Sequence, residues 1–209
     1  TEFMYREYAV MQPLQRSYAI NEERIENMLA KGSLNGIYDE AKIAELQAKE
    51  DLSNKDKKKL DTLEDGQPLY EDIVTTLRSA VSDTLYLSPR EFEPVLKAVL
   101  KPHAVELAVH KTLFAKIMDG LSLMDKTAEI QRDRKGNIIY DKETKDTEIV
   151  PFEESIDDYM AREVLPHIPD AKAFFEEDLT KKKPVIKTGA EIPFTRYFYQ
   201  YVPPKASDE

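Results

Sequence analysis

Three side chains in one segment have the chemistry of a metal site. His103, Glu106 and His110 are spaced three and four residues apart, so on a single helix they would share a face of about 60° of arc. Two imidazoles and a carboxylate form a ligand set that zinc accepts. The spacing differs from the HExxH pattern of zinc proteases, and His103 directly follows Pro102, where a helix starts. These differences favour polar residues on a partly exposed helix face, and we predict no metal ligands.

A second cluster of titratable groups lies between residues 153 and 158. Glu153, Glu154, Asp157 and Asp158 could supply a carboxylate pair for acid–base catalysis. Acidic residues in the first turn of a helix also stabilise its dipole, and this explanation needs no pocket. The sequence has no glycine-rich phosphate-binding loop and no nucleophile-elbow serine. We therefore predict no catalytic and no cofactor-binding residue, and a role in binding or assembly.

The composition is that of a highly charged chain with a modest core. Of the 209 residues, 41% are hydrophobic and 33% are charged, and the formal net charge is −10. Such a chain alone is repelled by DNA, because cationic side chains supply most non-specific affinity. The absence of cysteine excludes disulfides and cysteine-ligated zinc, and it favours an intracellular location. No apolar run approaches the roughly 20 residues of a membrane-spanning helix.

Capping residues and apolar spacing predict most of the helices. Each of four residues has the right type for an N-cap and precedes apolar residues at helical spacing: Asn21, Asp39, Ser53 and Ser88. The longest apolar faces occur between Ile73 and Met118. Residues 104–118 are apolar on nearly all sides, so we expect one central helix there.

Strand signals flank this helical region. Residues 3–14 are rich in aromatic and β-branched residues, and no partner strand follows directly, so we expect its partners in a preceding sheet of a longer chain. A small hairpin is predicted around Gly136 and Asn137. Residues 141–151 are expected to form a loop, a short helix begins at Ser155 or Glu154, and the chain beyond Pro169 is expected to be mostly irregular.

The predicted fold class is mainly α with small β elements (α+β). Residues 1–20 are expected to be a strand and linker, and residues 21–125 a helical domain. Residues 126–209 are expected to hold a small hairpin, a short helix and an extended basic and aromatic tail.

The tail, EIPFTRYFYQYVPP at residues 191–204, is the most unusual stretch. Its candidate contact residues are Arg196, Tyr197, Tyr199, Tyr201 and Lys205. Three interpretations stay open: nucleic-acid bases stack on the aromatic rings, the segment adds a strand to another sheet, or the rings close the domain's own core. Residue types alone favour the last.

Several blocks of the sequence follow one pattern. They are FMYREYAVMQPLQ (3–15), MDKTAEI (124–130), DTEIVP (146–151), YMAREVLPHIPDA (159–171) and GAEIPFTRYFYQYVPP (189–204). Together they closely resemble the C-terminal end of the modification (methyltransferase) subunit of type I restriction–modification systems. That family's pattern there includes Y-x-x-R-E-V-L-P-H-x-P-D-A-W and E-I-P-F-T-R-x-F-Y-x-Y-x-P-P. This chain departs from the pattern at Lys145, Lys172 and Lys205, which stand where the family usually has Arg, Trp and Arg, and Ala190 stands for Tyr.

The resemblance implies a parent protein that methylates adenine N6 in DNA with S-adenosylmethionine. The family's N-P-P-[YF] and cofactor-binding motifs do not occur here, so the chain is expected to be a C-terminal fragment of a prokaryotic, cytoplasmic enzyme, without cofactor of its own. The implied partners are the specificity subunit, a second methyltransferase subunit, the restriction subunit, and DNA through the complex.

In that family the corresponding region packs against the helices of the specificity subunit. The interface candidates here are Phe92, Val95, Leu96 and Val99, because they lie on the helix with the strongest start signal and a long apolar face. The alternative function is a stand-alone nucleic-acid-binding module that uses the basic and aromatic tail.

Overall fold

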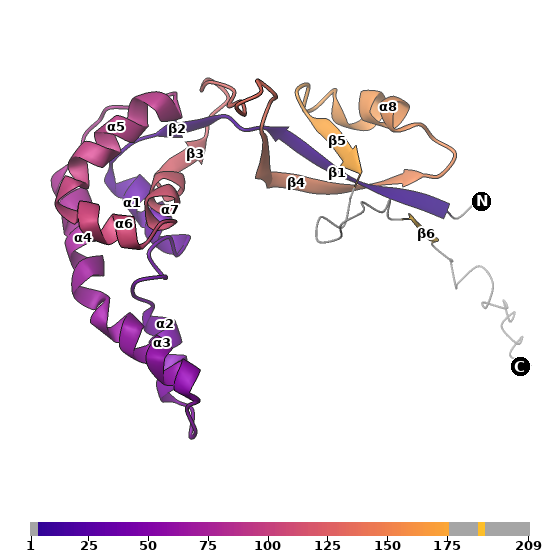
Figure 1. Cartoon of the computed structure of the whole chain (residues 1–209). Coiled ribbons are helices and arrows are strands. Elements are labelled where there is room, and N and C mark those ends of the chain that lie inside the picture. Colours follow the sequence, from indigo (N-terminus) through magenta and orange to yellow (C-terminus); the bar gives the residue numbers. More distant parts are fainter. Residues whose placement is uncertain (1–3, 176–187, 191–209) are drawn as a thin grey trace, which may run out of the picture. The chain divides into compact units, whose positions relative to one another are not determined.

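The computed structural model describes residues 4–175 and 188–190, and it divides the chain into two compact units (Figure 1). The helical unit is residues 15–131. The sheet unit combines residues 1–14 with residues 132–209. The fold is mainly helical with small sheets, as the sequence predicted. The described residues 4–14 and 132–175 are far apart in the sequence and belong to the same unit.

The helical unit begins and ends with short strands. Strand β2 (Arg16–Tyr18) pairs antiparallel with β3 (Ser122–Met124). Between them lie, in order, α1 (Glu22–Ala30), α2 (Glu40–Gln47), α3 (Asn54–Asp65), α4 (Gln67–Ser79), α5 (Pro89–Val99), the 3-10 turn η1 (Lys101–His103), α6 (Ala104–Val109) and α7 (Leu113–Gly120).

All four predicted N-caps are confirmed. In each case the side-chain oxygen accepts a hydrogen bond from a backbone N–H two or three residues on, which satisfies a donor that the helix leaves unpaired. The pairs are Asn21 with Arg24 (2.9 Å), Asp39 with Lys42 (3.0 Å), Ser53 with Asp56 (3.1 Å) and Ser88 with Arg90 (3.3 Å).

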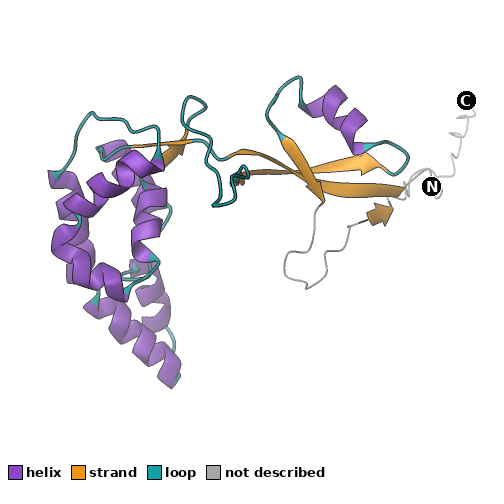
Figure 2. Ribbon diagram, turned by 45° about the horizontal axis from the view of Figure 1, so that its top comes forward, coloured by secondary structure: helices purple, strands orange, loops and turns teal. Residues whose placement is uncertain are grey.

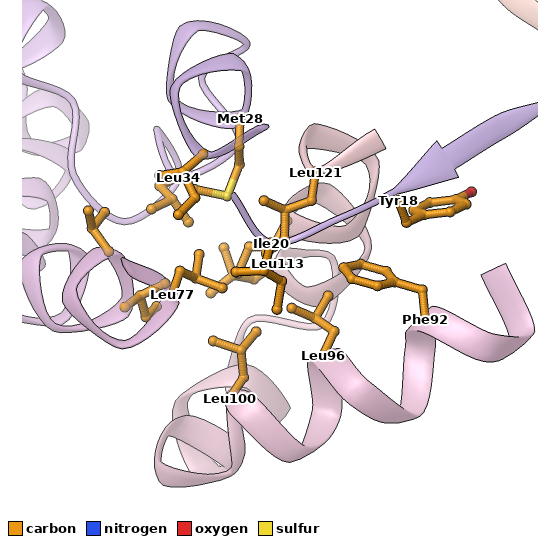
Figure 3. Close-up of a cluster of buried hydrophobic side chains, with 14 of the residues drawn as sticks. Tyr18, Ile20, Met28, Leu34, Leu77, Phe92, Leu96, Leu100, Leu113 and Leu121 are labelled. Atoms are coloured by element: carbon orange, nitrogen blue, oxygen red, sulfur yellow. The ribbon is translucent and has the colours of Figure 1, made fainter. Parts of the chain in front are cut away.

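The core of the helical unit gathers side chains from β2 and from α1, α4, α5 and α7 (Figure 3). Phe92 of α5 is fully buried, and its ring stacks on that of Tyr18 with centroids 5.3 Å apart. Tyr86 lies against the same ring at 5.5 Å. Leu96 and Leu100 extend this contact surface one and two turns further along the chain. The apolar face of α5 therefore belongs to the chain's own core.

Residues 104–118 form two helices, so the prediction of one central helix was wrong. The chain leaves the helical conformation at His110, whose ψ is 72°, and the Leu113 N–H then bonds the His110 carbonyl at 2.8 Å. Leu113 and Ile117 of α7 are buried, whereas Val105 and Val109 of α6 are 74% and 72% exposed. The packing of α7 into the core overrides the apolar periodicity that favoured a continuous helix.

The sheet unit is built around strand β1 (Met4–Pro13). Strand β4 (Tyr140–Pro151) pairs antiparallel with one edge of β1, and β5 (Lys172–Phe175) pairs antiparallel with the other. Strand β6 (Thr188–Ala190) pairs with β1 at Met4–Arg6. Helix α8 (Ile156–Tyr159) continues directly into the π-helical turn η2 (Met160–Val164).

Two predictions for these segments are corrected by the pairing. The partners of the N-terminal strand lie in this same chain, not in a preceding sheet. Residues 141–151 are a strand and not a loop, and residues 172–175 beyond Pro169 are also a strand. The polar composition of β4 suits an edge strand, whose unpaired side faces solvent, so composition alone did not reveal it. The predicted hairpin is reduced to a turn at Gly136 (φ 85°) with one bridge, Arg132 to Ile138.

We predict that Phe92→Ala destabilises the helical unit by about 3–5 kcal/mol, because the change leaves a cavity beside Tyr18. The matched control is Val105→Ala, which removes apolar atoms from an exposed helix face and should change the free energy of unfolding by less than about 0.5 kcal/mol. Urea unfolding followed by far-ultraviolet circular dichroism measures both. Equal losses in the two variants would contradict this account of the core.

Candidate functional site

The interface candidates on α5 do not share one environment. Phe92 and Leu96 are fully buried in the helical core, so their side chains offer no surface to a partner in the folded chain. Val95 and Val99 are half-buried, and Val99 packs against the same core. The tail candidates Arg196, Tyr197, Tyr199, Tyr201 and Lys205 lie outside the described residues.

The possible metal ligands are not brought together. His103 is buried, its Nε2 lies 3.0 Å from the Thr76 hydroxyl, and its Nδ1 lies 3.8 Å from a carboxylate oxygen of Asp72. Within residues 4–175 and 188–190, no group of three potential ligands has a geometry that could hold a metal ion. His103 therefore links α4 to η1.

The acidic cluster lies at the N-terminal end of α8. The Ser155 hydroxyl accepts a hydrogen bond from the Asp158 N–H at 3.2 Å, as an N-cap does. Glu154 accepts hydrogen bonds from Arg162 at 2.8 and 3.1 Å. Asp157 and Asp158 lie in the first turn of α8, where negative charge stabilises a helix.

The described part of the sheet unit contains a cavity of about 640 Å³, and it is the best candidate for a functional site. Its described lining residues come from β1, β4 and β5, from the α8–η2 segment, and from Leu165 and Ala171 after that segment. Figure 2 shows the ribbon of this helical segment next to the strands of the sheet unit. Its walls are predominantly apolar, and four charged residues complete the lining. The lining residues are Tyr8, Ala9, Met11, Lys142, Lys145, Ile156, Asp157, Met160, Leu165, Ala171, Lys172, Ala173 and Phe174.

The α8–η2 segment is fixed over the sheet by a small core and by a hydrogen bond. Val10 of β1 packs with Met160 and Val164, and all three are buried. The Tyr159 hydroxyl donates to a carboxylate oxygen of Glu148 on β4 at 2.6 Å. This bond and partial burial raise the pKa of Tyr159 to about 12. The α8–η2 segment is therefore attached to β1 by apolar packing and to β4 by a hydrogen bond.

Strand β4 contributes two lysines to the lining through an irregularity in its pairing. Val10 pairs with Asp146 and Gln12 pairs with Asp141, so residues 142–145 lie opposite Met11 alone. In a regular strand, residues three apart point to opposite faces, yet Lys142 and Lys145 both line the cavity. Bulges redirect side chains in this way.

Hydrogen bonds fix the bulge itself. The Gln12 N–H donates to the Thr144 hydroxyl at 2.9 Å, and that hydroxyl donates to the Asp141 carbonyl at 2.7 Å. The buried Asp141 carboxylate accepts from the Glu143 N–H at 2.9 Å. Sequence analysis missed this site, because it treated residues 141–151 as a loop. No pattern in the sequence indicated it.

No protein-family model, no curated protein and no solved structure matches this chain. Among the residues that the structure describes, no helix is both long enough and apolar enough to cross a membrane.

We predict that Glu148→Gln lowers the pKa of Tyr159 from about 12 toward its ordinary value of 10.0, because it removes the charge that holds the phenol proton. Carbon-13 tyrosine NMR measures this pKa, and Tyr159→Phe identifies the resonance among the 11 tyrosines. Asp146→Asn, on the same strand, is the control. Identical Tyr159 titrations in wild type and Glu148→Gln would contradict the assignment.

The sign of the linked stability change follows from the same shift. A tyrosine whose pKa is raised on folding stabilises the native state below its unfolded pKa, near 10, and this contribution is lost as the pH rises toward about 12. Wild type should therefore lose more stability than Tyr159→Phe over this alkaline range.

Proposed function

We propose that this chain is an assembly module, the C-terminal part of a type I modification subunit, and that it binds the specificity subunit. The observation that supports this best is the packing of the sequence blocks that carry the resemblance. Strand β1 lies in the first block and pairs with residues 146–151 of another. Val10 of the first block packs with Met160 and Val164 of the block at residues 159–171.

The block at residues 124–130 contacts the end of the first block in the helical unit. The Gln15 side-chain amide donates to the carbonyls of Lys126 and Ala128 at 3.1 and 3.0 Å, and the Asp125 N–H donates to the Gln15 carbonyl at 3.0 Å. Blocks that are far apart in sequence thus form common contacts, as expected of a folded module.

In this proposal the chemistry of methyl transfer belongs to another part of the parent enzyme. The sequence holds neither the N-P-P-[YF] motif nor the cofactor-binding motif of that family. In this proposal other parts of the assembled enzyme bind S-adenosylmethionine, DNA and the restriction subunit.

The exposed apolar residues of α6 are the contact surface that we propose for the helical unit, in place of Phe92 and Leu96. Val105 and Val109 are one turn apart, so they share a helix face, and each is nearly three-quarters exposed. Exposed apolar side chains that lie together are characteristic of protein interaction sites.

We predict that the chain co-elutes with its cognate specificity subunit on a sizing column at low and moderate salt. Val105→Glu with Val109→Glu should weaken the complex by about tenfold or more, because it places two charges in an apolar contact. The matched control is Ala41→Glu with Ala44→Glu, which adds the same charge to an exposed face of α2.

Circular dichroism verifies that every variant is folded. A folded wild-type chain that elutes alone under all these conditions would contradict the proposed function. Equal weakening by the α2 and α6 variants would contradict the assignment of the contact to α6.

A further inference from the structure

We infer that the cavity of the sheet unit binds a small amphipathic anion, with its apolar body against the apolar lining residues and one carboxylate beside the lysines of the lining. This inference goes beyond the proposed function, because it concerns a small ligand of one unit and needs no partner subunit. The described residues that line the site lie on β1, β4, β5 and the α8–η2 segment, and in the loop between η2 and β5.

The size and the lining of the cavity suit a small molecule. Ligand pockets typically occupy about 300–1,000 Å³ and have mostly apolar walls with a few polar groups that orient the ligand. This cavity has about 640 Å³. Its apolar lining includes Ala9, Met160, Leu165 and Ala173, which have no strongly polar side-chain atom to satisfy. An alkyl or aromatic body would bury its apolar surface there without leaving a polar group unpaired.

The lysines of the lining favour a ligand with a negatively charged head group. The lining holds Lys142, Lys145 and Lys172 and one acidic residue, Asp157, so cationic side chains outnumber carboxylates there, on a chain whose formal net charge is −10. Lys142 forms no ion pair with any residue described by the structure. The Lys172 ammonium lies 5.7 Å from the ring centroid of Tyr140 and 5.5 Å from that of Phe174. Aromatic rings attract a cation without neutralising it, so Lys172 retains its charge for an anion.

The bulge of β4 supports a binding role for the lysines, because it brings Lys142 and Lys145 to one cavity although they are three residues apart. Lysine carries a compact charge on a flexible stem, and such stems can lie along apolar walls while the ammonium stays at the water interface. The apolar lining residues and the lysines are thus complementary to the two ends of one amphipathic anion.

The test titrates the intact chain with decanoate, well below its micelle concentration, and measures binding by calorimetry. Decyltrimethylammonium, which has the same chain length and the opposite charge, is the control ligand. Decanoate should bind with one-to-one stoichiometry and at least about tenfold more tightly than the cation. Shifts of the Ala9, Leu165 and Ala173 NMR signals should locate the ligand in the cavity.

Two variants assign each part of the site. Lys142→Gln with Lys172→Gln should weaken decanoate binding by about tenfold, whereas Lys58→Gln with Lys59→Gln, which removes the same charge from the exposed face of α3, should leave it unchanged. Ala171→Phe should fill the cavity and abolish binding while the circular dichroism spectrum is preserved.

Equal binding of decanoate and the cation, or equal weakening by the two lysine pairs, would overturn the inference. The inference would also be overturned if the Lys142→Gln, Lys172→Gln variant no longer bound the specificity subunit but bound decanoate as wild type does. The lysines would then contact a protein partner and not a small anion. Failure of decanoate binding leaves the co-elution result standing, so the two proposals fail separately.

Discussion

The pairing of strand β1 on both of its edges is the interaction on which the sheet unit depends. Residues 5–13 pair with residues 140–151 on one edge, and residues 8–11 pair with residues 172–175 on the other. The helical unit, residues 15–131, lies between these partners in sequence. The entropic cost of closing a loop grows only slowly with its length, so a whole folded unit can be accommodated between two paired strands.

The same strand organises the candidate site. The side chain of Val10 anchors the α8–η2 segment, and Tyr8, Ala9 and Met11 line the cavity beside it. The irregular register of β4 directs two lysines toward that cavity. The site is therefore a product of register, because a regular ladder would place Lys142 and Lys145 on opposite faces of the sheet.

The helical unit separates its apolar residues into two groups with different roles. Phe92, Leu96 and Ile117 have no exposed surface and stabilise the unit. Val105 and Val109 lie on a short helix with no buried residue, so they contribute little to the core and are available for contact. Apolar character in the sequence is the same for both groups, and only burial distinguishes a core residue from an interface candidate.

The sequence by itself determined the local features of this protein: the four N-caps, the short helix after Ser155 and the mainly helical class. These depend on hydrogen bonds within three residues and on periodicity, which short segments contain in full. Tertiary structure alone decided the break at His110, the pairing of the polar segment 141–151 with β1, and the convergence of Lys142, Lys145 and Lys172 on one cavity. Each of these depends on contacts between residues far apart in the chain, and burial and register are properties of such contacts, so no local pattern records them.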